Sequence, residues 1–261
     1  MNNGALSRLF ASTIILLDAC SGGIKQPFEQ TSDVSYVVDS SVNFSVTSRD
    51  GTIRIYGSDL PELRVHTVKK AYSSARLEKI VHKIVAATDS ISITTEFPPG
   101  PKWSWEDRSG TVDYTIILPQ AATITRVELD HGEMLIEGIR EGALHARLGS
   151  GLMFVRNCFS DMQVDVTAGN LTLSYDWWEQ IPFTAAATVH KGNIWSFIPG
   201  DAAFHLVAQS PSGRISNDFS EKEERRPGPL RKIDMIVQAG DRTSLSIRAE
   251  NGNIRIAETN P

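Results

Sequence analysis

A glycine followed by aliphatic residues at alternating positions recurs seven times along this chain of 261 residues. Two copies that lie far apart in the sequence read LDHGEMLIEG (129–138) and AENGNIRIAE (249–258). In every copy a large aliphatic residue stands two positions after the glycine, and an aliphatic residue or alanine stands five positions before it. The seven turn glycines are Gly51, Gly132, Gly151, Gly169, Gly192, Gly213 and Gly252.

The spacing within and between these copies predicts a β-solenoid. Alternation with a period of two marks a half-buried strand, and the glycine supplies the positive φ that a tight turn needs. From Gly132 to Gly213 the glycines are 18 to 23 residues apart, a period too short for a four-stranded propeller blade. We therefore expect an all-β, single-domain parallel β-solenoid over residues 36–258, with coils of about 20 residues stacked about 4.8 Å apart. A plain β-sandwich, whose strands also alternate and turn at glycine, is the alternative fold.

Two insertions interrupt the repeat. Within residues 61–97, PELRVHTVKKA and SISITTEF alternate as strands. Between them, SSARLEKIVHKI (73–84) places four aliphatic residues on one helical face, which predicts a short inserted helix. The second insertion, DFSEKEERRPGPLRK (218–232), is charged and contains proline, so it is expected to be a surface loop.

The N-terminus has the features of a secretory signal. One basic residue, Arg8, precedes an apolar run from Leu9 to Leu17, which is too short to span a bilayer but suits a signal peptide. The run ends in Leu-Asp-Ala-Cys, which resembles the lipobox of bacterial lipoproteins except for the aspartate. The resemblance implies a signal peptide over 1–19, and a lipidated N-terminus and flexible tether over 20–35. It also implies a membrane anchor at Cys20 and, from Ser21, sorting to the outer membrane.

Four stretches together resemble the putative adhesin domain of bacterial envelope proteins, a family of unknown function with repeated N-G-x-I-x-V turns. They are SRDGTIRIYGSDLPELRVHTVKKA (48–71), TVDYTIILP (111–119), the tandem glycine copies of 127–219, and GDRTSLSIRAENGNIRI (240–256). The resemblance spans roughly residues 40–258. It implies a non-enzymatic scaffold or adhesin-like binding module of the bacterial cell envelope, facing the periplasm or the exterior, with an unknown protein or glycan as its ligand.

Composition and motifs argue against several other functions. The formal net charge is −5, and no broad basic face is evident, so nucleic-acid binding is not expected. No nucleotide-binding, hydrolase or zinc-ligand spacing appears in the sequence, so neither a cofactor nor a metal is expected. Cys20 and Cys158 are the two cysteines, and Cys158 is expected to be a buried small residue because no basic neighbour activates it.

Tryptophans provide the candidate ligand-binding surface. Four of the five lie in turn-rich stretches, PPGPKWSWEDRSG (98–110) and DWWEQIPF (176–183). Exposed rings beside carboxylates suit a sugar- or peptide-binding surface, whereas buried rings would close the edges of the coils. Both interpretations apply to Trp103, Trp105, Trp177 and Trp178.

An alternative function is polysaccharide cleavage by a carbohydrate-active solenoid. Asp161 and Asp165 are four residues apart and would share one face of a strand, and Arg147 or Arg156 could act as the base. This hypothesis requires that the carboxylates and an arginine converge on one point in a groove.

Overall fold

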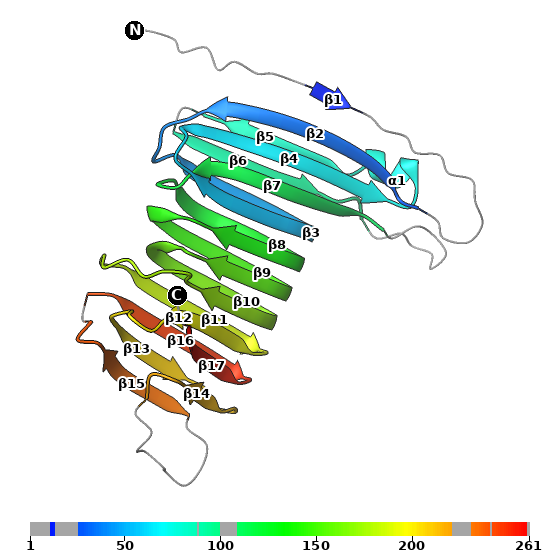
Figure 1. Ribbon diagram of the computed structural model, residues 1–261. Helices are drawn as coiled ribbons and strands as arrows, with labels where there is room; N and C mark the ends of the chain where they lie inside the picture. Colours follow the sequence, from blue (N-terminus) through cyan, green and yellow to red (C-terminus); the bar gives the residue numbers. More distant parts are fainter. Residues whose placement is uncertain are drawn as a thin grey trace.

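The computed structural model describes residues 11–13, 26–87, 89–99, 109–220, 231–240 and 242–259. In this part of the chain, β-strands join into one large mixed sheet that does not close on itself, and the prediction of an all-β protein is confirmed (Figure 1). The core of the sheet is a parallel stack that includes the four long strands β3 (Asn43–Ser58), β8 (Thr123–Glu137), β9 (Arg140–Arg156) and β10 (Phe159–Ser174).

Each long strand bends at its repeat glycine, which divides it into a first half and a second half. The glycines of adjacent strands are register partners, Gly51 with Gly132, Gly132 with Gly151, and Gly151 with Gly169. In the later coils the two halves are separate strands. These pairs are β11 (Thr184–Lys191) with β12 (Ile194–Pro199), β13 (Phe204–Gln209) with β14 (Ile215–Asn217), and β16 (Ser244–Asn251) with β17 (Ile254–Thr259).

The bend requires glycine for two reasons. The φ angles at five of the seven positions lie between 132° and 140°, where a side chain is strained. In addition, a Cβ on Gly151 would lie 1.8 Å from the carbonyl oxygen of Gly132, and one on Gly192 would lie 1.7 Å from that of Gly169. Neighbouring backbones therefore approach each other closely at every bend.

Asparagines strengthen the same corner in the later coils. The side-chain oxygen of Asn170 accepts a hydrogen bond from the backbone N–H of Asn193 at 3.0 Å, and that of Asn193 accepts one from the N–H of Asn253 at 2.9 Å. The ladder ends where the side-chain oxygen of Asn253 accepts from the N–H of Arg214 at 3.0 Å, because Arg214 stands where another asparagine would continue it.

The stack does not follow the order of the chain. The closing coil, β16 and β17, pairs in parallel with β11 and β12 on one side and with β13 and β14 on the other. Gly252 consequently lies between Gly192 and Gly213, and the last repeat in the sequence is the penultimate layer of the stack.

Antiparallel strands cover parts of both ends of the stack, so the predicted purely parallel solenoid is not what the structure shows. At one end, β6 (Ser90–Glu96) and β7 (Thr111–Pro119) pair in parallel with the two halves of β3. Antiparallel pairs then follow, β5 (Val81–Ala86) on β6, β4 (Glu62–Ala71) on β7, and β2 (Phe28–Val37) on β4. At the same end a three-residue strand β1 (Ala11–Thr13) pairs antiparallel with β2. At the other end β15 (Lys232–Val237) pairs antiparallel with β13.

The predicted helix over 73–84 is too long. Helix α1 spans only Ser74–Glu78, with the hydroxyl of Ser73 accepting a hydrogen bond from the backbone N–H of Arg76 at its start. Residues from Val81 onward belong to β5, because each of them up to Ala86 pairs with a residue of β6 and their side chains alternate between exposed and partly buried. The aliphatic positions that suggested one helical face are thus divided between a short helix and a strand.

The core lies inside the bend of the stack. Inward positions of successive strands carry aliphatic side chains with at most 3 % of their surface exposed, as at Ile53, Met134, Met153, Leu171, Ile194 and Ile254. One exception is Ser196, which is 1 % exposed and has no hydrogen-bond partner for its hydroxyl among the described residues. Ser196 stands four residues after Gly192, where most copies of the repeat have an aliphatic residue.

Candidate functional site

The two outward faces of the bent stack differ in chemistry. On the face formed by the first halves, the outward side chains are mainly polar, for example Thr47, Glu128, Arg147, Asp165 and Thr188. On the face formed by the second halves, apolar side chains occupy several outward positions. We call these residues the apolar row, and they are Leu135, Leu152, Phe154, Trp195 and Phe197.

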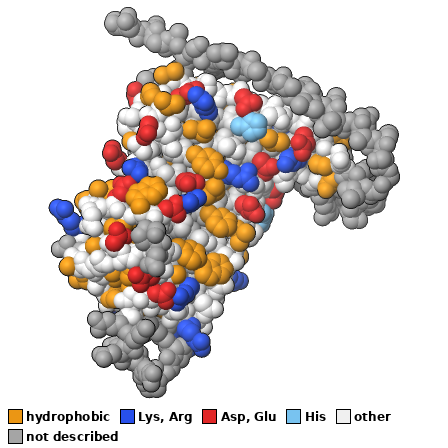
Figure 2. Space-filling view, in the orientation of Figure 1, with side chains coloured by type: hydrophobic (Ala, Val, Ile, Leu, Met, Phe, Trp, Pro, Cys, Tyr) orange, Lys and Arg blue, Asp and Glu red, His pale blue; other side chains and the backbone are white. Residues whose placement is uncertain are grey.

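Strand register brings the apolar row together. Leu135 pairs with Phe154 across β8 and β9, and Phe154 pairs with Thr172, which in turn pairs with Trp195 across β10 and β12. Leu152 and Phe154 are 38 % and 40 % exposed. In Figure 2, hydrophobic side chains form a broken run along the stacking direction, among acidic and basic ones.

An apolar row on this face is informative because a sheet face that contacts water normally carries polar residues. Strand alternation accounts for the inward aliphatic residues, and it leaves outward positions free to be polar. Isolated exposed hydrophobic residues are common on protein surfaces, whereas contiguous ones mark interaction sites.

Charged side chains flank the apolar row. A pocket of about 350 Å³ opens between Arg54, Glu133, Phe154 and Arg156 on this face. Arg156 donates to a carboxylate oxygen of Asp176 at 2.6 Å, and this hydrogen bond raises the pKa of Arg156. The pocket thus combines an aromatic ring with fixed charges of both signs.

Two tryptophans of the candidate surface, Trp177 and Trp178, are described, and they pack beside the coil that follows β10. Trp178 packs against Tyr175, Phe183 and Phe204, with ring centroids 5.3 to 5.7 Å apart. Trp177 is 43 % exposed, and its indole N–H donates to Glu179 at 3.0 Å. Trp177 retains an accessible ring edge, while Trp178 is mostly a packing residue.

The residues Cys20, Ser21, Trp103 and Trp105 of the sequence-based predictions lie outside the described part of the chain. Among the residues that the structure describes, no helix is long and apolar enough to cross a membrane. Cys158 is completely buried, and burial raises the pKa of its thiol to about 12.

The residues of the alternative enzymatic hypothesis are only partly brought together. Arg147 and Asp165 are register partners and line one groove of about 410 Å³ on the first-half face. Asp161 lies on the same strand, but its carboxylate accepts a hydrogen bond from the backbone N–H of Thr184 at 2.7 Å. Arg156 lies on the opposite face, so the set does not converge on one point.

His190 also lines this groove. Its Nε2 is 3.1 Å from Asp165 and its Nδ1 is 3.0 Å from Glu250. The hydrogen bond to Glu250, followed by the one to Asp165, raises the pKa of His190 against the opposing effect of burial. The structure therefore places a histidine between two carboxylates from neighbouring coils.

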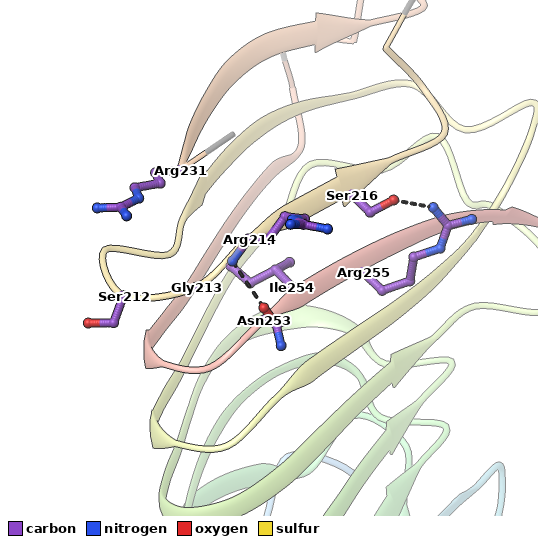
Figure 3. Close-up of a pocket in the computed structure, with 8 residues that line it drawn as sticks. All are labelled: Ser212, Gly213, Arg214, Ser216, Arg231, Asn253, Ile254 and Arg255. Carbon is purple, nitrogen blue, oxygen red and sulfur yellow. Dashed lines mark hydrogen bonds between the residues drawn. The ribbon is translucent and has the colours of Figure 1, made fainter. Parts of the chain in front are cut away.

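A pocket of about 460 Å³ at the end of the stack was not predicted from the sequence (Figure 3). Three arginines, Arg214, Arg231 and Arg255, and two serines line it. The signal that could have indicated it is the arginine that follows Gly213, where the two preceding copies of the repeat, and the closing one, have asparagine.

No family model and no curated protein matches the chain. Among solved structures, a "putative cell adhesion protein" from Clostridium sporogenes aligns with a TM-score of 0.52 and 13 % identity, over 90 % of this chain and all of that one. A "putative adhesin" from Bacteroides fragilis aligns with a TM-score of 0.36 and 10 % identity, over 87 % of this chain and 97 % of that one. At such low identity the first of these likenesses shows a shared fold, and the chain is similar in architecture to a protein named for adhesion.

Proposed function

We propose that this protein is a non-enzymatic binding module of the bacterial cell envelope, held to the membrane by a lipid at Cys20. The parallel core of the sheet acts as a β-solenoid scaffold that displays one side chain from each coil at regular intervals. The observation that carries the proposal is the apolar row, in which Leu135 pairs with Phe154 and a single threonine separates Phe154 from Trp195, on a sheet face that is otherwise free to be polar. The fold that the chain shares with the clostridial protein supports it.

The chemistry of the face favours a glycan as the ligand. Sugar rings present apolar C–H surfaces together with many hydroxyl groups, and the face offers Phe154 and Trp195 together with Arg54, Glu133 and Thr172. Adjacent strands lie about 4.8 Å apart, so the path from Leu135 to Trp195 is roughly 14 Å long. An extended chain of sugars would lie across the strands along this path.

The test compares Phe154→Ser and Trp195→Ser with the wild-type full-length protein in binding to dextran, polygalacturonate and heparin, measured by affinity electrophoresis. Val85→Ser is the matched control, because Val85 is 49 % exposed but lies on the terminal strand β5. Each row variant is expected to bind about tenfold more weakly, which corresponds to about 1.4 kcal/mol, while the control is unchanged. The proposal would be refuted if the wild type bound none of these polymers, or if both row variants bound them as tightly as the wild type.

Polysaccharide cleavage remains the second candidate because Arg147, Asp165 and His190 share a groove. The same polymers, incubated with the protein, provide its test through the release of reducing ends. Turnover that disappears in Asp165→Asn would replace the binding proposal by an enzymatic one.

A further inference from the structure

The terminal pocket contains more positive charge than the described residues around it neutralise. Arg255 is fixed in place, since it donates to the hydroxyl of Ser216 and to the carboxylate of Asp218, both at 2.6 Å. Neither Arg214 nor Arg231 makes a side-chain hydrogen bond or ion pair within the described residues. Both side chains are exposed, and the chain as a whole is acidic, with a formal net charge of −5.

The pocket has hydrogen-bond donors of the kind that an oxyanion needs. Arg214 directly precedes β14, Ser216 lies within it, and Arg255 is the register partner of Ser216. Figure 3 shows Arg214 and Arg255 on the side of the pocket near Ser216, with Arg231 and Ser212 on the other side. Guanidinium groups bind phosphate, sulfate and carboxylate through paired hydrogen bonds, and hydroxyl groups add further donors.

This pocket continues the apolar row. Arg255 is the register partner of Trp195 across β17 and β12, so the arginines begin one strand beyond the last ring of the path from Leu135. A ligand that lies along the apolar row and extends to the end of the stack reaches Arg255 and then Arg214.

We propose that the terminal pocket binds an oxyanion carried by an acidic glycan, a phosphate, sulfate or carboxylate group on a chain whose sugar rings lie along the apolar row. The proposal rests on the binding function proposed above and specifies the ligand class. Arg214 and Arg231 contact the anion, while Ser216 and Asp218 hold Arg255 in position beside it. Binding weakens with increasing salt, because exposed charges are screened.

The experiment measures binding of full-length wild-type protein, Arg214→Gln and Arg231→Gln to dextran, polygalacturonate, heparin and inorganic phosphate. Dextran is neutral, polygalacturonate carries carboxylates and heparin carries sulfates, so these probes separate the sources of the anion. Lys83→Gln is the control, because it removes one exposed charge from β5 near the opposite end of the stack. Urea unfolding of the variants shows that any loss of binding is not a loss of fold.

The expected result is that each arginine variant binds at least one of the anionic probes on the order of tenfold more weakly. Dextran binding and stability are expected to be unchanged, and Lys83→Gln to behave as wild type. Equal affinity of the wild type for dextran and every anionic probe, or no effect of either arginine variant, overturns this inference and leaves the binding function intact. Failure of the proposed binding function would appear differently, because Phe154→Ser and Trp195→Ser would then leave the affinity for every polymer unchanged.

Discussion

At the scale of single residues, the repeat glycines limit how closely the coils can stack. A Cβ at Gly192 would approach the carbonyl oxygen of Gly169 to 1.7 Å, and the φ angle there is 137°. A strained φ costs about 1–3 kcal/mol, and backbone atoms, unlike the end of a side chain, cannot move away without separating the strands. The cost of a side chain at this corner is therefore local strain plus disruption of the ladder on both sides.

We predict that Gly192→Ala lowers the free energy of unfolding by about 3 kcal/mol or more, combining backbone strain with overpacking. Urea unfolding provides the measurement. Gly200→Ala is the matched control, because the atoms nearest to a Cβ there belong to the flexible side chain of Glu258. A Gly192→Ala protein as stable as the control would show that the corner relaxes without strain.

His190 gives the molecule a pH-dependent contact between coils. Its pKa is raised in the folded protein by Glu250 and Asp165, so the protonated form stabilises the fold. This stabilisation is complete below the pKa of histidine in the unfolded chain and is lost as the pH rises through the raised pKa. Glu250 has a lowered pKa because of the same hydrogen bond, with a further contribution from Arg248, so it remains charged throughout this range.

We expect the wild type to lose stability relative to His190→Gln between about pH 5.5 and about pH 9, which bracket the ordinary pKa of histidine. Glutamine keeps hydrogen-bonding groups near both carboxylates but does not titrate. The measurement is the free energy of unfolding of each protein at intervals across this range. Parallel curves for the two proteins would exclude His190 as the cause of the pH dependence.

At the scale of strands, the closing coil holds the end of the stack in place. Strands β16 and β17 are the parallel partners of both preceding and following layers. Without them, β11 and β12 would expose a sheet edge, and β13 and β14 would lose their parallel neighbours. Unpaired backbone groups at such an edge are both costly and prone to pairing with other chains.

Removing residues 244–261 is therefore predicted to unfold β11 to β15 and to promote aggregation, although it deletes only the end of the sequence. Limited proteolysis and size-exclusion chromatography provide the test, with a chain ending at Thr259 as the control. Protection of the segment 184–217 in the shortened protein would mean that these strands are stable without their neighbours.

Strand alternation predicted the stacked layers well, because each layer repeats the same local rule. Helix α1 shows where local rules are insufficient. Leu77 and Ile80 satisfy a helical pattern, but Val81 pairs with Glu96 on β6, and this long-range pairing ends the helix early. The arginines of the terminal pocket are separated by up to 41 residues in sequence, from Arg214 to Arg255, and only the insertion of the closing coil brings them together.

For the whole molecule, the sequence indicates the all-β class and the position of each bend, but not the order of the layers. The copies present similar edges, since a polar residue precedes each of Gly192, Gly213 and Gly252. The choice of neighbour depends on how side chains such as Asn193, Asn253 and Arg214 meet across the layers, which no single copy reveals. The apolar row escaped prediction for the same reason, because its members come from different copies.

The position of the closing coil also has a consequence for biosynthesis. During translation the N-terminal layers can assemble as they emerge, since β8, β9 and β10 each pair with an earlier strand. Strands β13 and β14 must wait, because their parallel neighbours are among the last residues to leave the ribosome. Such long-range pairing slows folding, so the layer of β13 and β14 is completed only after the closing coil has been synthesised, and an interrupted chain cannot complete its terminal pocket.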